Sequence, residues 1–587
     1  MTHAGSASSD SLAVNNRPRL PEGWSLWLAG VLGVYLVTLL LIRPEDYSDT
    51  FNYAKHIVDQ HYLPAQPQGS AFWDFGHVLW RPMGYMVWSP FRGVLAKAFG
   101  GDELLAAGAV LISLSIVGGL TGAVFLFLLA ARTTRSPAAA AIATVGYLST
   151  NAILHYQLTG MSYVAGLACQ IAGLYYLHRS ITERRLGFAR GIAAGLPLGL
   201  SVVVWFPYVL SLPGIFCYAL LVREGDDIPD FRRRAALLVG LAAGAAAVVM
   251  VVYGCAMAAG HFTSVASVSN WIARSRYDKL PNRGVLRMLG SIPRGFFSLG
   301  QGSTAWKRML FEHRILSPVD LIRTGIWKVA LVYLALAASV HALWRSVWGR
   351  RLLVCLFVTA LPIAIFAAFL FEATPPERYM AAFPLLFLGF AWIMADPGAG
   401  RIVRFALAAF FACTLAVNVT ALLRFREPAE FESARIELRA LNDRIAPHDC
   451  IVVLSLQDPV VRLVEARPFS PSSRIRFQYF SPVPWGSAHP ESWRRVVAER
   501  VETAWKNGGR AWLANRFLAD LPDPAWGWVE GDDRRIRWSD FHLFFERLDL
   551  GNAFGGTDGF SEILPTERNR LVFDSSQLPG DSGASGR

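Results

Sequence analysis

The chain has 587 residues, of which 53% are hydrophobic and only 17% are charged, and its mean hydropathy is +0.34. This composition excludes an ordinary soluble enzyme and, with 19 Trp and 37 Phe, a disordered scaffold. The net charge of +12 does not indicate nucleic acid, because most basic residues fall between apolar runs, as the positive-inside rule expects. The composition therefore predicts a polytopic membrane protein.

Apolar runs long enough to cross a hydrocarbon core of about 30 Å recur along the chain. The eight clearest cover residues 24–42, 104–131, 160–178, 235–258, 326–344, 351–371, 379–395 and 402–423. Two less regular regions, 137–154 and 188–222, add three more, because Pro207 and Pro213 split the second into two short helices. The sequence thus predicts an all-α core of about eleven transmembrane helices.

Arginine clusters between these runs give the chain an orientation. In the eleven-helix arrangement they share one side: Arg17, Arg19, Arg132, Arg135, Arg179, Arg184, Arg185, Arg232, Arg233, Arg234, Arg345, Arg350, Arg351, Arg401 and Arg404. Cytoplasmic loops carry such an excess, so the tail 1–23 is expected in the cytoplasm. The transmembrane domain, 24–423, then exposes outer loops 43–103 and 259–325. The Ala/Arg-rich chain is typical of bacteria, which predicts the inner membrane.

The chain changes character after the last apolar run. Residues 424–574 predict a small extracytoplasmic α/β domain, and the Ser/Gly-rich tail 575–587 is expected to be disordered. Within the domain we expect a helix and three strands, at Glu427–Leu441, Cys450–Leu456, Ala511–Ala514 and Asp540–Phe545.

Two aspartates follow the first apolar run. Asp46 and Asp49 lie next to the membrane surface, where apolar surroundings favour a carboxylate that acts as a general base. The spacing of Asp49, Tyr53, His56 and Gln60 suits one face of a short interfacial helix. The alternative is that the aspartates only cap this helix and complement its dipole.

Residues 73–85, later in the same outer loop, mix aromatic, His and Arg side chains. His77 and Arg81 are four residues apart, so a helical turn would direct both toward one ligand, and a guanidinium suits a phosphate. The alternative is that both side chains only snorkel at the interface.

The outer loop 259–325 is strongly basic. Its cations are Arg274, Arg276, Lys279, Arg283, Arg287, Arg294, Lys307, Arg308, Arg314 and Arg323. Arg287 and Arg294 flank an apolar stretch, which predicts an amphipathic segment at the interface beside a phosphate. Attraction to anionic lipid headgroups explains the same charges without catalysis.

A third motif, Glu372-Ala-Thr-Pro-Pro-Glu-Arg-Tyr379, stands at the predicted outer mouth of a helix. Arg378 would either bind a phosphate or pair with Glu372 or Glu377.

In this order, the motifs resemble those of the GT-C superfamily of membrane glycosyltransferases, of the family 39 type. Asp49-Thr-Phe-Asn-Tyr53, His77 with Arg81-Pro-Met-Gly-Tyr85, and Glu377-Arg-Tyr379 are similar to elements of its oligosaccharyl, mannosyl and aminoarabinosyl transferases. The resemblance covers roughly residues 24–423. The chain departs from the commonest pattern because Asp46 and Asp49 are not adjacent and because His77 precedes Arg81-Pro82 by four residues.

The resemblance implies transfer of a hexose or pentose from a polyprenyl-phosphate-linked donor to a lipid, glycan or protein acceptor at the outer face, with inversion. In such a step a carboxylate activates the acceptor hydroxyl and cations stabilise the departing lipid phosphate. Asp49 is the candidate base and Asp46 the second. The candidates for binding the donor phosphate or the substrate are Tyr53, His77, Arg81, Arg287, Arg294, Glu372, Arg378 and Tyr379.

Cofactors and partners follow from the same reasoning. No cofactor is certain, and Mg²⁺ or Mn²⁺ stays open, because Asp46, Asp49 and His77 are suitable donors but do not define a coordination sphere. No Cys-x-x-Cys pair indicates a zinc site. The expected partners are the lipid-linked donor, its acceptor and membrane lipids, with no nucleic acid.

Two other classes of protein remain alternatives. A transporter or flippase of lipid-linked saccharides would carry charges at the bilayer midplane and inverted repeats, whereas these apolar runs are almost free of charged residues. The other is a non-catalytic envelope assembly protein that binds a partner.

Asn418, inside the last apolar run, is expected to make a hydrogen bond between helices.

Overall fold

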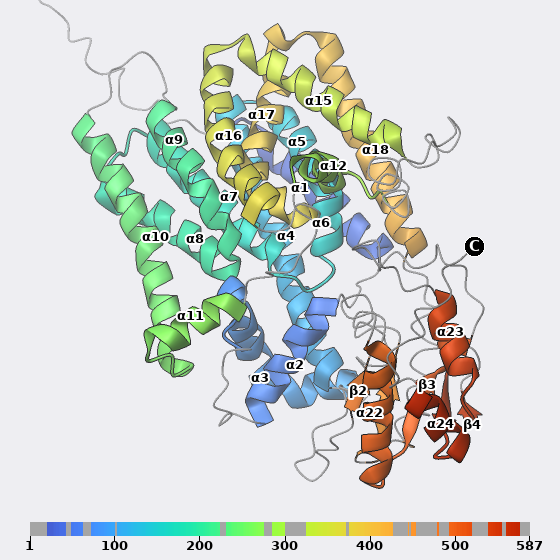
Figure 1. Cartoon of the computed structure of the whole chain (residues 1–587). Coiled ribbons are helices and arrows are strands. Elements are labelled where there is room, and N and C mark those ends of the chain that lie inside the picture. The colour runs from blue at the N-terminus through green and yellow to red at the C-terminus, as the bar shows by residue number, and fades with distance from the viewer. Residues whose placement is uncertain are drawn as a thin grey trace, which may run out of the picture. The chain divides into compact units, whose positions relative to one another are not determined.

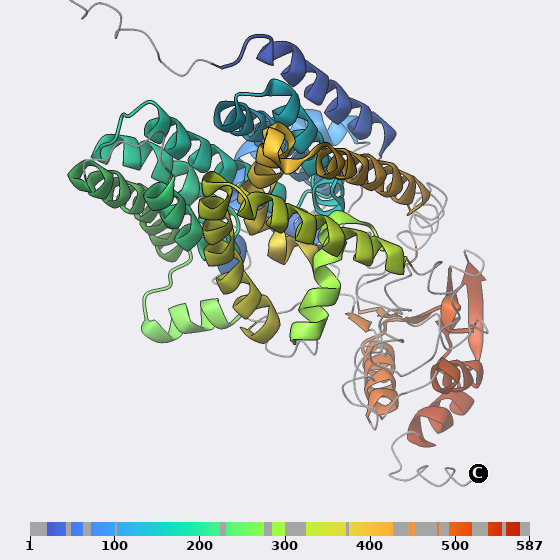
Figure 2. The same cartoon turned by 90° about the horizontal axis from the view of Figure 1, so that it is seen from above.

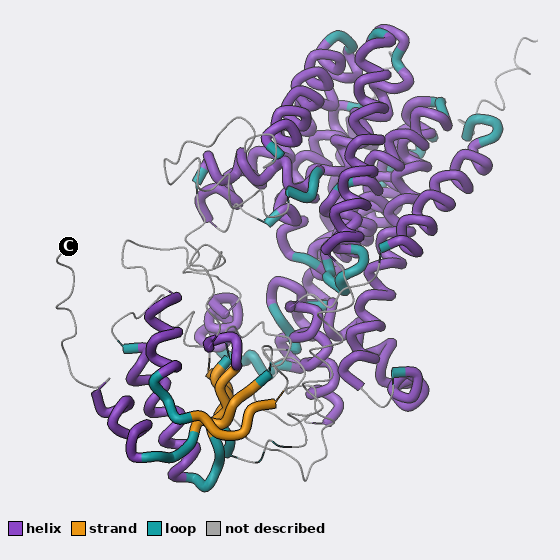
Figure 3. The backbone as a smooth tube through the Cα atoms, turned by 90° about the vertical axis from the view of Figure 1, so that its right-hand side faces the viewer, coloured by secondary structure: helices purple, strands orange, loops and turns teal. Residues whose placement is uncertain are grey.

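A computed structural model of the chain describes residues 20–42, 48–62, 72–99, 103–222, 231–274, 284–299, 325–370, 375–425, 444, 446, 448–453, 478–480, 492–518, 538–554 and 559–575. The chain divides into two compact units. Residues 1–57, 65–90 and 107–426 form the first, and residues 58–64, 91–106 and 427–587 form the second. Among the described residues, strands occur only in the C-terminal part, as Figure 3 shows.

The regular secondary-structure elements described up to residue 425 are all helices (Figure 1). The α-helices are α1 (Trp24–Leu41), α2 (Ser48–Tyr62), α3 (Trp80–Ala98), α4 (Glu103–Thr134), α5 (Pro137–Ser149), α6 (Asn151–Tyr156), α7 (Tyr163–Thr182), α8 (Phe188–Val204), α9 (Leu212–Leu221), α10 (Phe231–Ala259), α11 (Val265–Arg274), α12 (Val285–Phe296), α15 (Ile326–Trp344), α16 (Val347–Ile365), α17 (Phe383–Ala395) and α18 (Arg401–Phe425). Five shorter turns join them: η2 (Phe75–His77), η3 (Phe206–Ser211), η4 (Phe366–Leu370), η5 (Pro376–Ala382) and η6 (Pro397–Ala399).

Seven helices in the described residues are long and apolar enough to cross a bilayer. They are Trp24–Leu41, Glu103–Thr134, Phe231–Ala259, Ile326–Trp344, Val347–Leu370, Pro376–Ala395 and Arg401–Leu423. Three shorter apolar helices, Pro137–Ser149, Phe188–Val204 and Phe206–Leu221, match the expected irregular spans. The predicted span at 160–178 forms α7 but is not among the seven, so the count of eleven spans is not confirmed. The chain is a multi-pass membrane protein.

Glycines allow α8 and α10 to pack against each other along their length, side by side in Figures 1 and 2. Gly191, Gly195 and Gly199 recur every fourth residue on α8, opposite Gly240 and Gly244 on α10. A Cβ at Gly199 would lie 2.6 Å from the Ala245 carbonyl oxygen, and one at Gly244 would lie 2.7 Å from that of Ile192. Small residues at this spacing let membrane helices approach closely without a hydrophobic driving force between them.

Asn418 makes the expected interhelical hydrogen bonds. Its side-chain amide donates to the Ser149 carbonyl at 2.8 Å and to the Phe296 carbonyl at 2.6 Å, and its Oδ1 accepts from the Ser298 N–H at 2.7 Å. The residue is fully buried. It therefore satisfies backbone groups at the end of α12 that α12 itself leaves unpaired.

The second unit contains a five-stranded mixed sheet of order β2-β1-β3-β5-β4. The strands are β1 (Cys450–Val452), β2 (Gln478–Phe480), β3 (Ala511–Ala514), β4 (Leu550–Phe554) and β5 (Phe560–Ile563). β1 pairs in parallel with β2 and β3, and β5 pairs antiparallel with β3 and β4. The helices are α22 (Trp493–Lys506), α23 (Trp538–Glu546) and α24 (Glu567–Ser575), with η7 (Asn515–Leu518). The predicted helix Glu427–Leu441 lies outside the described residues.

The strand predicted at Asp540–Phe545 is wrong, because these residues belong to helix α23. Phe541, Phe544 and Phe545 all contact the buried Trp493 ring, at centroid distances of 4.4, 5.1 and 6.3 Å. Spacings of three and four residues place these rings on one helical face. The run of aromatic residues suited a strand locally, and packing against α22 selected the helix. The predictions at 450–456 and 511–514 correspond to β1 and β3.

Candidate functional site

The short helix predicted after the first apolar run is confirmed as α2, which begins at Ser48. Tyr53 on this helix is only 5% exposed. Asp49 lies in the first turn, although its side chain is outside the described part of the structure, as is all of Asp46. The backbone therefore places Asp49 one helical turn before Tyr53.

The segment leading into α3 folds as an Asx turn. The Asp74 carboxylate accepts a hydrogen bond from the Gly76 N–H at 2.8 Å, which caps η2. Two other elements bind its backbone: the Trp271 indole N–H of α11 donates to the Trp73 carbonyl, and the Tyr253 hydroxyl of α10 donates to the Phe75 carbonyl at 2.8 Å. The turn that carries His77 is thus fixed from two helices.

Arg81 is buried between a carboxylate and an aromatic ring. Its guanidinium pairs with Asp74 at 3.2 Å, and its carbon Cζ lies 4.6 Å from the centre of the Tyr53 ring. The Arg81 side chain is 5% exposed and that of Asp74 is 28% exposed. Such burial is favourable for a cation only with partners of this kind.

His77 is held by a serine and two tyrosines. Its Nδ1 lies 2.7 Å from the Ser162 hydroxyl, and its ring lies 5.6 Å from that of Tyr53 and 5.9 Å from that of Tyr163. Burial lowers the pKa of His77 to about 4; Asp74 opposes this shift, and the charges of Arg81 and Arg378 add to it. His77 is therefore neutral at pH 7.

The third motif forms η5. The Tyr156 hydroxyl donates a hydrogen bond to the Glu377 carboxylate, and the Arg378 guanidinium lies 3.6 Å from its other oxygen. Arg378 also lies over the Trp205 ring, at 5.7 Å. The sequence left Glu372 and Glu377 as possible partners of Arg378, and the structure places Arg378 beside Glu377. Glu372 lies outside the described residues.

One chain of contacts joins these motifs. Tyr163 packs on His77, on Tyr156 at 4.8 Å and on Trp205 at 4.8 Å, so it connects the His77 turn to the Glu377–Arg378 pair. His77 and Arg81 do not point together from one helical turn as predicted, since η2 ends at His77 and α3 begins at Trp80. Both instead contact the Tyr53 ring.

The basic loop supplies α12. This helix is amphipathic, as predicted, and it is buried on one side, where Ser291 and Phe296 lie, whereas Val285 and Leu289 are exposed. α12 packs against η5, and Arg294 lies close enough to Tyr379 to act on its hydroxyl electrostatically. Arg287 precedes Arg294 by two turns of the same helix.

The described residues do not fit a divalent cation at this site. Asp74 already pairs with Arg81, and the Nδ1 of His77 contacts Ser162. No group of three or more His, Cys, Asp and Glu side chains that could hold a metal ion occurs in the described ranges. The side chains of Asp46 and Asp49 are outside these ranges.

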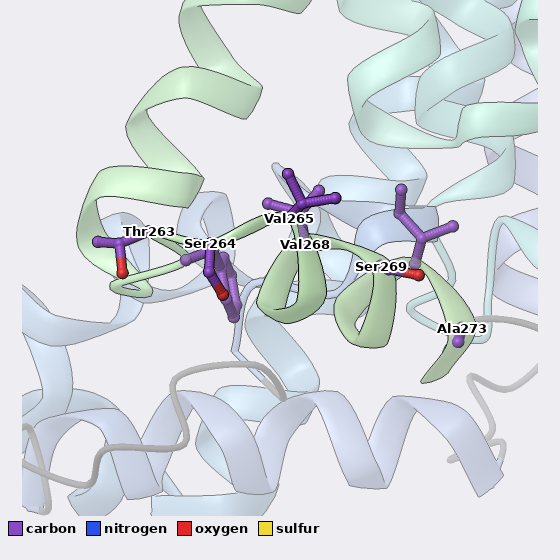
Figure 4. A pocket seen from close by; sticks show the side chains of 8 residues that line it. Thr263, Ser264, Val265, Val268, Ser269 and Ala273 are labelled. Atoms are coloured by element: carbon purple, nitrogen blue, oxygen red, sulfur yellow. The ribbon is translucent and has the colours of Figure 1, made fainter.

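A separate pocket of about 500 Å³ lies along α11 (Figure 4). Its lining consists of apolar and hydroxyl side chains: Phe262, Thr263, Ser264, Val265, Val268, Ser269, Ile272 and Ala273. None of the candidate site residues lines it, and its lining carries no charged group. It therefore offers neither an acid, a base nor a cation for phosphate.

Several site residues were not predicted from the sequence. Tyr156, Ser162, Tyr163 and Trp205 lie in or beside apolar runs, and nothing in their local pattern distinguishes them from packed core. Asp74 did leave a signal, because Asp-Phe-Gly is typical of an Asx turn before a helix.

The fold and site together define a multi-pass membrane protein with a helical core, a small C-terminal mixed sheet and a buried cluster of Tyr, His, Arg and Glu. No protein-family model matches the chain, and no curated protein matches it. Solved structures do resemble it. ArnT from Cupriavidus metallidurans, an aminoarabinosyl transferase bound to undecaprenyl phosphate, is 14% identical with a TM-score of 0.49, covering 88% of this chain and 96% of that one.

Two structures of the Archaeoglobus fulgidus oligosaccharyltransferase are also similar. The apo form is 14% identical with a TM-score of 0.49, covering 91% of this chain and 74% of that one. The complex with Zn and sulfate is 14% identical with a TM-score of 0.47, covering 92% and 73%.

Proposed function

We propose that this protein is an inverting membrane glycosyltransferase of the GT-C type. It transfers a hexose or pentose from a polyprenyl-phosphate-linked donor to an envelope lipid, glycan or protein. The observation that carries the proposal is the convergence of three distant motifs: Tyr53, the His77–Arg81 segment and the Glu377–Arg378 pair lie in one buried cluster. Packing alone would not require two arginines in this cluster.

In the proposed reaction Asp49, with Asp46 second, accepts the proton of the acceptor hydroxyl. The acceptor oxygen bonds to the anomeric carbon as the bond from that carbon to the phosphate oxygen breaks. The lipid phosphate leaves with the bonding electron pair, and Arg81 and Arg378 stabilise its added charge. Arg287, Arg294 and Tyr379 extend this phosphate site, with Tyr53 and neutral His77 facing the sugar and Glu372 and Glu377 orienting the cations.

The charge distribution supports an orientation with the N-terminus in the cytoplasm. Glu183, after α7, pairs with Arg132 of α4 at 3.2 Å, with Arg179 at 2.7 Å and with Arg185 at 3.9 Å. Basic residues from two helices thus gather at one end of the helical unit, which suits the positive-inside rule. We accordingly propose a bacterial inner-membrane protein whose site and C-terminal domain face outward.

The test is sugar release in liposomes from a panel of labelled polyprenyl-phosphate sugars, with an envelope extract as acceptor. Asp49→Asn is the matched variant, since it keeps the shape of the side chain and removes its basicity. We expect the wild type to turn over at least one donor and the folded Asp49→Asn variant to turn over none. Absence of turnover with every donor would overturn the proposal and leave transport of the same lipids to be tested.

The same assay decides the cation requirement. Asp74 already pairs with Arg81, and His77 already contacts Ser162, so the proposed reaction uses groups of the protein alone. Turnover is measured after chelation and after separate return of Mg²⁺ and Mn²⁺. If one of the two ions restores turnover after chelation, that ion binds to a group of ligands that includes Asp46 or Asp49.

A further inference from the structure

Four consecutive residues between α6 and α7 are each held by a different part of the chain. We call residues 159–162 the strap. Its four contacts are the Thr50 hydroxyl donating to the Thr159 carbonyl, the Trp80 indole donating to the Gly160 carbonyl at 3.0 Å, the Ser115 hydroxyl donating to the Met161 carbonyl at 2.7 Å, and the Ser162 hydroxyl contacting His77 at 2.7 Å. The strap thus touches α2, α3, α4 and η2.

Gly160 is the residue that lets the strap adopt this path. Its φ is +68°, in the left-handed region that side chains other than glycine disfavour. A Cβ at this position would lie 2.6 Å from the Thr50 Cγ2 and 3.2 Å from the Ile112 Cγ1. Both the backbone conformation and the close approach of Thr50 therefore require glycine.

Thr50 connects the strap to the proposed chemistry. It is fully buried, it lies in the first turn of α2, and it directly follows Asp49. At the other end of the strap, Ser162 contacts His77. One short segment thus fixes both the start of the helix that carries the proposed base and the histidine of the second motif.

We propose that the strap is a positioning element, and that Gly160 sets where the first turn of α2 lies relative to His77. This rests on the proposed transferase function. Adding a Cβ at residue 160 would displace Thr50, and Asp49 with it. Because a misplacement of about 1 Å can cost about 100-fold in rate, the displacement should reduce kcat. The donor KM should change less, because Arg81 keeps its ion pair with Asp74 and Arg378 keeps its pair with Glu377.

Four variants test this. Gly160→Ala adds the Cβ, Thr50→Ser removes the methyl group that the Cβ would meet but keeps the hydroxyl, and Gly160→Ala/Thr50→Ser combines them. Gly33→Ala in α1 is the control, because a Cβ there would meet nothing within 4 Å. Each is measured for kcat and KM with the donor that the wild type uses, and for hydrogen exchange of residues 48–62.

We expect Gly160→Ala to lower kcat about 10- to 100-fold with little change in KM and to speed exchange in residues 48–62. The double variant should recover part of kcat and protection, because it removes the contact with the Thr50 methyl group but keeps alanine at the left-handed φ, and Gly33→Ala should match the wild type. A folded Gly160→Ala with unchanged kcat, or a double variant no better than Gly160→Ala, would overturn the inference. If the wild type consumes no donor, the proposed function fails. Hydrogen exchange of residues 48–62 then tests the strap by itself, and unchanged protection of these residues in Gly160→Ala overturns the inference.

Discussion

The Tyr156 hydroxyl donates a hydrogen bond to the Glu377 carboxylate across 221 residues of sequence. Tyr156 is 5% exposed and Glu377 is 4% exposed. The other carboxylate oxygen faces Arg378 at 3.6 Å. A buried carboxylate is tolerated where both oxygens have partners, so this arrangement fixes η5 against α6 and with it the guanidinium that we assign to the donor phosphate.

Tyr156→Phe should lower the free energy of unfolding by about 2 kcal/mol, because a hydrogen bond to a charged group is lost and the acceptor stays buried. Tyr253→Phe is the control, since its hydroxyl donates to the neutral Phe75 carbonyl and should cost about 1 kcal/mol. Chemical denaturation in detergent measures both. Equal losses in the two variants would contradict the role of the Glu377 charge.

Arg81→Lys should raise the donor KM about tenfold or more, because an ammonium lacks the planar fork that binds phosphate and stacks on Tyr53. Arg92→Lys is a matched control, since Arg92 also lies over a tyrosine ring, that of Tyr62, at 5.9 Å. Initial rates over a range of donor concentrations measure the effect. An unchanged KM in Arg81→Lys would remove Arg81 from the phosphate site.

The sequence predicted the features that depend on local periodicity. The helix around Tyr53 followed from its polar face, and the long apolar runs gave most membrane helices. The strand predicted at residues 540–545 is wrong because the same aromatic run suits a strand or a helix. Packing of its rings against the distant Trp493 favours the helix. Contacts between distant residues, such as Tyr156 with Glu377, leave no local pattern.

The candidate site shows the same limit. The sequence singles out His77, Arg81 and Arg378 as candidates, because charged and imidazole groups stand out in apolar surroundings. It does not single out Ser162 and Gly160, since a small residue between two helices is typical of any short connection. Their roles depend on contacts with residues distant in sequence: Thr50 approaches Gly160, and His77 contacts Ser162.

Lowering the pH should destabilise the protein through His77. Its folded pKa of about 4 lies below the ordinary value of about 6.5, so the unfolded chain binds the proton more readily. The stabilisation is complete above pH about 6.5 and is lost as the pH falls toward 4. His77→Gln should therefore show a weaker decrease of melting temperature across this window than the wild type. Identical profiles would show that His77 does not titrate as proposed.

Arg234 holds the end of a neighbouring helix. Its guanidinium donates to the carbonyls of Ala219, Leu220 and Val222 at 3.1, 2.7 and 3.1 Å, at the C-terminus of α9. A cation at this end satisfies unpaired carbonyls and complements the helix dipole. Arg234→Met should lower the free energy of unfolding by about 2 kcal/mol or more. Arg233 is the exposed neighbour of Arg234, and Arg233→Met should change the free energy of unfolding by less than about 1 kcal/mol; a similar loss in both variants would argue against the cap.

Asp449 should be essential for the fold of the second unit. Its fully buried carboxylate accepts hydrogen bonds from the Ala446 N–H at 3.0 Å, the Arg510 N–H at 2.7 Å and the Trp512 indole at 3.0 Å. Asp449→Asn would turn an amide donor toward one of these donors, so we expect a loss of about 3 kcal/mol. Glu499→Gln, which alters only an exposed pair with Arg495, should cost less than about 1 kcal/mol. Hydrogen exchange of β1 and β3 measures the difference, and full protection of both strands in Asp449→Asn would refute it.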